Sequence, residues 1–177
     1  DMVEKLFRSC SEDGLRFISA VDANKGSGGY AEYIFRHAAL KLYQIDLSKF
    51  ASMSTLPYKQ GRNPDFAELD IHSCVKAIME TDFRSKTVNS DKDINNLQNA
   101  LKMPNMKFLR AYGFRNIQTV MLKMRRNKCD FDYVEIMACP SGCANGGGQI
   151  KTQVTEHPTE IAERVKKTQS YFHSSLV

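Results

Sequence analysis

The sequence has no stretch long and apolar enough to cross a membrane, which would need about 18 consecutive apolar residues. A quarter of its 177 residues are charged. The first four residues, Asp1 to Glu4, lack the apolar centre of a secretory signal. The chain also begins without an initiator methionine. We therefore expect no membrane association, and we expect the chain to be a fragment of a longer protein.

The cysteines do not form a disulfide framework. There are five of them, an odd number, and only Cys139 and Cys143 are close neighbours. Thiols without such a framework suit a reducing compartment. The net charge of +5 is mild and scattered, and its one dense cluster runs from Lys123 to Lys128. Because that cluster ends a predicted helix, where cations oppose the helix dipole, we expect no nucleic-acid binding.

The two neighbouring cysteines lie in a stretch whose pattern favours metal chemistry. An apolar run that contains Val134 and Ile136 leads to Cys139, and three glycines, Gly146 to Gly148, follow Cys143. Thiolates are soft ligands that suit iron–sulfur clusters, zinc or copper(I). Glycine lets the backbone approach such a ligand closely. The C-x3-C spacing differs from the C-x2-C with which zinc sites more often begin.

A strand–helix–strand pattern leads to these cysteines. Met106 to Tyr112 predicts a strand that ends at Gly113, and Phe131 to Ala138 predicts a second strand. The helix between them, Arg115 to Asn127, has one apolar face made of Ile117, Val120, Met121 and Met124. This order predicts a βαβ unit with parallel strands. Sites form beyond the carboxyl ends of such strands, so the pattern places Gly113 and Cys139 at the functional edge.

A second glycine-rich turn, Gly26 to Gly29, precedes another predicted helix. The apolar stripe of that helix consists of Ala31, Ile34, Phe35, Ala38 and Leu42. A glycine-rich turn before a helix can bind an anion, because free N–H groups and the helix dipole point into it. This turn lacks the lysine and the spacing of a P-loop. From these residues alone, a flexible turn is the simpler interpretation.

The remaining elements predict an α/β fold with a small, mainly parallel sheet flanked by helices. Alternation over Phe66 to Ile71 predicts a further strand near an edge. The stretch around 75–105 reads as a polar surface insertion with a short helix capped by Ser90. Pro158 begins a last amphipathic helix. The core is expected to contain Phe108, Ile117, Val120, Val134 and Ile136.

The run from Met137 to Gln149 resembles the last of the three cysteine motifs of the iron-only hydrogenases. It is more similar to the motif of their eukaryotic non-hydrogenase relatives, the Nar1-like proteins of cytosolic iron–sulfur assembly and the nuclear prelamin A recognition factors. Those relatives have serine, like Ser141 here, where the hydrogenases have glycine. Lys25 to Ala39 and Arg110 to Gln118 resemble two further family segments, a glycine-rich helix start and the strand-turn-helix before the last motif.

The resemblance implies that the chain is a single C-terminal lobe of a larger hydrogenase-like protein. It implies that Cys139 and Cys143 ligate a [4Fe–4S] cluster, which cysteines upstream of this chain complete. Cys10, Cys74 and Cys129 lie outside any matching motif and are expected not to be ligands. The residues expected around the cluster are Gly28, Gly29, Met137, Asn145, Gly146, Gly147 and Gln149.

The function that the resemblance implies is cytosolic iron–sulfur cluster assembly, with delivery of clusters to cytosolic and nuclear apoproteins. The expected partners are the proteins of the cytosolic targeting complex and the N-terminal lobe of the same protein, in the cytoplasm and also the nucleus. No enzyme activity is expected. One alternative is an iron-only hydrogenase, against which Ser141 and the pair Gln149-Ile150 argue. The other is a prelamin-binding nuclear relative, which nothing in the residues separates from an assembly factor.

Overall fold

A four-stranded sheet forms the centre of the computed structural model, which describes residues 29–61, 63–82, 90–148 and 157–174. Its strands lie in the order β1 (Lys59–Gln60), β2 (Phe66–Asp70), β3 (Lys107–Tyr112) and β4 (Tyr133–Met137). The helices are α3 (Tyr30–Tyr43), α4 (Ile71–Thr81), α5 (Asp91–Lys102), α6 (Phe114–Arg125) and α7 (Pro158–Ser174). None of the helices described is long and apolar enough to span a membrane.

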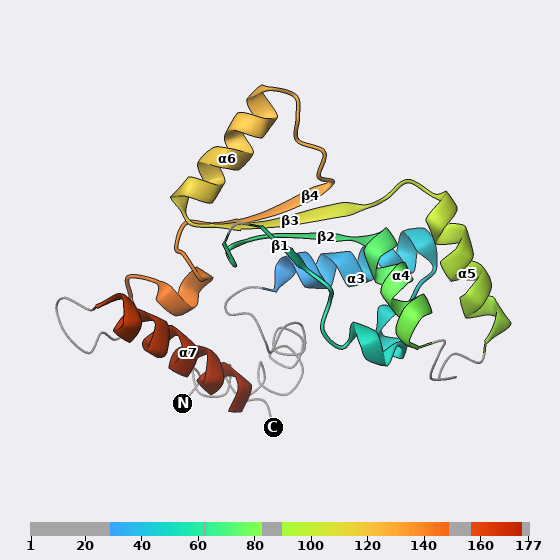
Figure 1. The fold of residues 1–177 in the computed structure, drawn as a ribbon, viewed down its shortest axis with the longest axis horizontal. Coiled ribbons are helices and arrows are strands. Elements are labelled where there is room, and N and C mark those ends of the chain that lie inside the picture. Colours follow the sequence, from blue (N-terminus) through green and yellow to red (C-terminus); the bar gives the residue numbers. More distant parts are fainter. Residues whose placement is uncertain (1–28, 62, 83–89, 149–156, 175–177) are drawn as a thin grey trace, which may run out of the picture.

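Helices cover both faces of the sheet, which gives the expected α/β layers (Figure 1). Helices α3, α4 and α5 lie on one face, and α6 lies on the other. The first face carries the larger core, in which Phe35, Leu69 and Phe108 are almost completely buried. The α6 face has a smaller core around Leu109, Ala111 and Val120. The α/β class with a sheet flanked by helices is therefore confirmed.

The βαβ unit of the sequence analysis is present. Strands β3 and β4 pair in parallel, from Phe108 opposite Tyr133 to Tyr112 opposite Met137, and α6 connects them over one face (Figure 1). The predicted last helix is also present as α7, and Pro158 is its first residue. The parallel pair brings the carboxyl ends of both strands to one edge of the sheet, as the pattern predicted.

The sheet is mixed, so the prediction that it is mainly parallel was wrong. Strand β2 pairs antiparallel with both β1 and β3. The reason is the connection between β2 and β3, which consists of two helices that pack against each other, α4 and α5. A pair of antiparallel helices returns the chain to the end of the sheet from which it left. Strand β3 therefore starts beside the end of β2 and runs back along it.

The stretch around 75–105 is part of the core, so its interpretation as a polar insertion was wrong. It contains most of α4 and all of α5, and each helix contributes fully buried side chains, Val75 and Ile78 from α4 and Leu97 and Ala100 from α5. The predicted short helix is real, with Ser90 at its N-cap position. Its exposed polar face dominates the composition, although the narrow apolar stripe decides where it packs.

Two expected core positions are exposed or shifted. Ile136 is 48% exposed, because β4 has only β3 as a neighbour in the described sheet and α6 covers it incompletely. On α3, Leu42 is 62% exposed and Tyr43 is buried in its place. The Tyr43 hydroxyl donates a hydrogen bond to the Pro104 carbonyl at 2.6 Å. Tyr43 is buried on the same face of α3 as Ala31, Phe35 and Ala39.

Candidate metal centre

The cysteine turn, residues 139–146, begins two residues beyond β4. Cys139 is half-buried, and Cys143 is exposed within a short 3-10 helix, Gly142–Asn145. The Gly113 N–H donates to the Met137 carbonyl at 2.8 Å, so the carboxyl ends of β3 and β4 are joined directly. A β-carbon on Gly113, whose φ is +83°, would stand 3.4 Å from Cγ of Pro140. Gly113 and Cys139 thus lie at the same edge, as the topology predicted.

A carboxylate from another part of the chain holds this turn in place. Oδ1 of Asp65, in the loop before β2, accepts a hydrogen bond from the Ser141 N–H at 2.9 Å. The Asp65 carbonyl also accepts from the Tyr112 N–H at 2.9 Å, which ties the same residue to the end of β3. Asp65 was not predicted. Its only local signal was the turn composition of the loop, which says nothing of a contact 76 residues away.

The backbone of the cysteine turn curls through two consecutive left-handed residues, Ser141 with φ 61° and Gly142 with φ 69°. The Gly142 N–H then donates to the Cys139 carbonyl, and the Gly146 N–H donates to the Cys143 carbonyl, each at 3.0 Å. Gly142 permits the curl, because glycine adopts a positive φ without strain. Ser141 shares the curl, although a left-handed conformation is costly for a residue with a β-carbon.

Helix α7 supports the far end of the cysteine turn. Nη2 of Arg164 donates to Oδ1 of Asn145 at 3.1 Å, and α7 contacts the short 3-10 helix directly. The side-chain oxygen of Asn145, one of the residues expected around a cluster, therefore holds the last helix. Arg164 was not predicted, because nothing near it in the sequence distinguishes it from other charged residues on α7.

The glycines after Cys143 leave space beside the turn. A β-carbon on Gly147 or Gly148 would have no atom of the described residues within 4 Å, whereas one on Gly146 would stand 3.1 Å from the Cys143 carbonyl oxygen. Two thiols and an open glycine stretch suit a thiolate-bound cluster, which normally needs four thiolates. Among the described residues, no group of three or more His, Cys, Asp and Glu side chains could hold a metal ion. The described part of the turn therefore fits half of a ligand set.

The glycine-rich helix start is joined to β4 by a buried acid. Gly29 is the N-cap of α3, with φ 61°. The N–H of Ala31 donates to Oε2 of Glu135 at 2.5 Å, and the Tyr112 hydroxyl donates to Oε1 at 2.5 Å. Glu135 is only 6% exposed, although a glutamate on an amphipathic strand would ordinarily face solvent. The first turn of α3 thus donates to a carboxyl side chain of this chain, and residues 26–28 of the glycine-rich turn lie outside the described residues.

The other predicted residues occupy different places. Met137 ends β4 beside the cysteine turn, and Gly28 and Gln149 lie outside the described residues. Cys74 is fully buried on α4, and burial raises the pKa of its thiol to about 12. Cys129 precedes β4, at the opposite end of that strand from Cys139. Cys10 lies outside the described residues.

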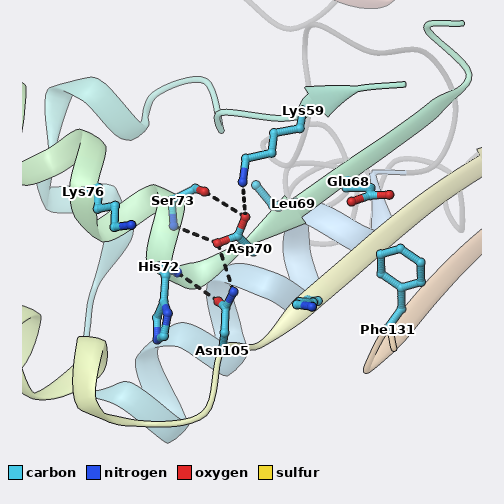
Figure 2. Close-up of a pocket in the computed structure, with 10 residues that line it drawn as sticks. Lys59, Glu68, Leu69, Asp70, His72, Ser73, Lys76, Asn105 and Phe131 are labelled. Carbon is cyan, nitrogen blue, oxygen red and sulfur yellow. Dashed lines mark hydrogen bonds and ion pairs between the residues drawn. The ribbon is translucent and has the colours of Figure 1, made fainter. Parts of the chain in front are cut away.

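A polar cavity of about 320 Å³ lies at the other end of the sheet (Figure 2). Its centre is Asp70, which accepts hydrogen bonds from Lys59 at 2.9 Å, from the Ser73 N–H at 2.8 Å and from Asn105 at 3.3 Å. The His72 N–H donates to Oδ1 of Asn105 at 3.2 Å. These polar groups bind one another, so the cavity gives no indication of a ligand.

The model of the family described as iron only hydrogenase large subunit, C-terminal domain, matches residues 18–147. That range includes β1 to β4, the helices between them and the cysteine turn. The chain belongs to this family. The match ends within the glycines that follow Cys143.

Several curated relatives are similar to this member of the hydrogenase-like family. A cytosolic Fe-S cluster assembly factor of Danio rerio is 34% identical, over 87% of this chain and 29% of the relative. The cytosolic iron-sulfur assembly component 3 of Rattus norvegicus is 36% identical, over 89% and 27%. A probable cytosolic Fe-S cluster assembly factor of Anopheles gambiae is 42% identical, over 81% and 23%. The chain thus spans less than a third of the length of these relatives.

Among solved structures, one from a study of [FeFe]-hydrogenase oxygen inactivation is similar at a TM-score of 0.45 and 18% identity. The similarity covers 82% of this chain and 35% of that one.

Proposed function

We propose that Cys139 and Cys143 supply two thiolate ligands of a [4Fe–4S] cluster whose other ligands come from sequence outside this chain. The supporting observation is the geometry of the cysteine turn. Both thiols lie on one curled turn at the carboxyl end of a parallel strand pair, close to Gly147 and Gly148, around which the described residues leave open space. When bound, such a cluster supplies one-electron redox chemistry. Met137, Gly29 and Gly146 to Gly148 form the surroundings of that cluster.

The chain acts, in this proposal, as the C-terminal lobe of an iron–sulfur protein that helps deliver clusters to cytosolic and nuclear apoproteins. Relatives that match over more than four-fifths of the chain are named as cytosolic iron–sulfur assembly factors. Its partners are proteins of the cytosolic targeting complex, and it works in the cytoplasm and the nucleus. It has no hydrogenase activity.

The remaining partner is an N-terminal lobe of the same protein. Strand β4 pairs only with β3 in the described sheet, and Ile136 on it is half exposed. On the neighbouring helix α6, Phe114, Met121 and Met124 are exposed as well. Apolar side chains beside an open strand edge suit the burial of a further lobe. That lobe brings the missing cysteines to the exposed Cys143.

The ligand assignment is tested by single substitutions in the complete natural polypeptide. Cys139→Ala and Cys143→Ala should each lose most of the cluster after anaerobic reconstitution, measured by iron and sulfide content and visible absorbance. Both should lose the maturation of client enzymes. Cys129→Ala is the matched control and should keep the cluster, because Cys129 lies at the other end of β4. A cluster that survives Cys143→Ala but not Cys129→Ala would overturn the assignment.

The absence of hydrogenase activity needs a separate measurement. Hydrogen evolution with a strong electron donor should stay at background for the complete protein with its cluster loaded. A turnover that disappears in Cys143→Ala would instead identify the protein as a hydrogenase, and the proposed role in assembly would then fail.

A further inference from the structure

Glu135 reverses the burial pattern of its strand. It is the one residue of β4 that is fully buried, whereas its apolar neighbours Val134 and Ile136 are half-buried and exposed. An isolated buried carboxylate is strongly unfavourable, so it must be hydrogen-bonded. A strand that buries its acid and exposes an isoleucine indicates that the acid has a specific role.

Both oxygens of Glu135 accept hydrogen bonds from buried partners. The Tyr112 hydroxyl donates to Oε1 and the Ala31 N–H donates to Oε2, each at 2.5 Å. A carboxyl group can accept hydrogen bonds at both of its oxygens, because each oxygen carries lone pairs. Burial, and then the bond to Glu135, raise the pKa of the Tyr112 phenol well above its ordinary value. The Tyr112 hydroxyl therefore remains a donor at any physiological pH.

The bond to Ala31 joins two parts of the candidate centre that are far apart in the sequence. Ala31 is the second residue of α3 and follows the N-cap Gly29. Its N–H belongs to the first turn, where a helix offers no carbonyl partner of its own. Glu135 lies on β4 four residues before Cys139, at most about 13 Å along an extended strand. The carboxylate thus ties the glycine-rich start of α3 to the strand that leads into the cysteine turn.

We propose that Glu135 is a positioning residue that holds the glycine-rich start of α3 against the cysteine strand, and so sets the width of the space beside Cys139 for the cluster. The inference rests on the proposed function, because it assigns the role of Glu135 relative to the cluster. The length of the Glu135 side chain is what allows this role. Its two oxygens span the gap between Tyr112 on β3 and Ala31 on α3, and a shorter acid cannot contact both.

Two conservative variants of Glu135 distinguish the effect of side-chain length from the effect of side-chain charge. Glu135→Gln keeps the length of the side chain, so its amide oxygen still accepts from Ala31 while its NH2 group donates to the Tyr112 oxygen. Glu135→Asp keeps the charge but loses one methylene and therefore the reach. In the complete polypeptide, we expect Glu135→Gln to keep most of the reconstituted cluster. We expect Glu135→Asp to lose more than half of it and to alter the electron paramagnetic resonance signal of the remainder.

Hydrogen exchange of the Ala31 amide reports on the contact itself, in protein without cluster. In Glu135→Asp this exchange should accelerate about tenfold or more, because the amide loses its buried acceptor on Glu135. The amide of Tyr33 is an internal control, since it bonds to the Gly29 carbonyl within the helix. Glu68→Gln and Glu68→Asp are matched controls on β2 and should change neither exchange nor cluster content.

The proposal is overturned if Glu135→Asp matches the wild type in Ala31 exchange, or if it speeds that exchange while cluster content and spectrum stay unchanged. A pattern in which Glu135→Gln loses the cluster and Glu135→Asp keeps it also overturns it, because charge would then matter and reach would not. Failure of the proposed function is distinct. It would appear as a cluster that survives Cys139→Ala and Cys143→Ala, and the Ala31 exchange result would be unaffected by it.

Discussion

The two ends of the central sheet are each closed by a carboxylate at the start of a helix, but the two carboxylates reach over different distances. At the cavity end, Asp70 is the N-cap of α4, and its side chain accepts from the N–H of Ser73, three residues later. At the cysteine end, Glu135 accepts from the N–H of Ala31, which lies 104 residues earlier. The first arrangement is local, and the second depends on the whole fold.

The two acids also differ in their exposure to water and in the charge of their partners. Asp70 is partly exposed and has a lysine partner, Lys59, whose ammonium group is largely in water. Glu135 is buried, and its donors among the described residues, the Ala31 N–H and the Tyr112 hydroxyl, are neutral. Water can replace a partner of Asp70 but cannot reach a partner of Glu135. We infer that the cavity end tolerates change, whereas the cysteine end is held in a single arrangement.

The largest expected effect is that of Glu135→Ala, which would remove the contact between β4 and the start of α3 at the cysteine end of the sheet. It leaves the buried donors of Tyr112 and Ala31 without an acceptor. The free energy of unfolding, from urea titration, should fall by about 2–4 kcal/mol. Glu68→Ala, half-buried on the same sheet, is the control and should change it by less than about 0.5 kcal/mol. Equal effects of the two substitutions would contradict the comparison.

The corresponding substitution at the cavity end, Asp70→Ala, should lower the free energy of unfolding by less than Glu135→Ala does. The loss of an N-cap acceptor typically costs about 1–2 kcal/mol, and Ser73 then donates to water instead. Thermal and urea unfolding of Asp70→Ala, Asp70→Ser and wild type would measure this, since serine restores the cap without the Lys59 ion pair. If the serine variant is no more stable than the alanine variant, the cap is not what stabilises α4.

The free energy of unfolding, measured as a function of pH, tests the contribution of Asp70, which is partly exposed to water. Burial by itself raises the pKa of this carboxyl. Lys59 and the N–H and hydroxyl of Ser73 lower it by more than burial raises it, so the net pKa is below the ordinary 3.8. The stabilisation by Asp70 is therefore complete above about pH 4 and is lost as the pH falls through the folded pKa. The stability difference between wild type and Asp70→Asn should therefore shrink as the pH falls below about 4. A difference independent of pH would contradict the lowered pKa.

The smallest effect concerns the curl of the cysteine turn. Ser141 has φ 61°, a conformation that glycine adopts without strain. Ser141→Gly should therefore stabilise the protein by roughly 0.5–1 kcal/mol and raise the melting temperature slightly. The N–H that donates to Asp65 is retained. Ser141→Ala is the control and should bring no such gain, because alanine also carries a β-carbon.

Several elements could be predicted because their signals lie within a few residues. The β3–α6–β4 unit follows from apolar runs, Gly113 and a helical stripe, and the start of α7 follows from Pro158. The position of Cys139 after β4 follows from the same unit. Near neighbours in the sequence are near neighbours in space within one helix or one strand, so these patterns needed no knowledge of the rest of the chain.

Other features could not be predicted, because they depend on which elements meet. The antiparallel pairing of β2 with β3 depends on how α4 packs against α5. The exposure of Ile136 depends on its edge position, which an alternating pattern does not reveal. Asp65 and Arg164, which hold the cysteine turn, come from a loop and a helix with no local sign of that role.

The sequence by itself determined the chemistry of this protein, namely two thiols, a curl of small residues and the strand that carries them. Only the tertiary structure decided which residues support the cysteine turn and its strand. A carboxylate on an amphipathic strand normally points to water, since an ion is better hydrated than buried. Glu135 is buried only because the fold brings a tyrosine hydroxyl and a free helix N–H to its two oxygens, and no short stretch of sequence contains those partners together.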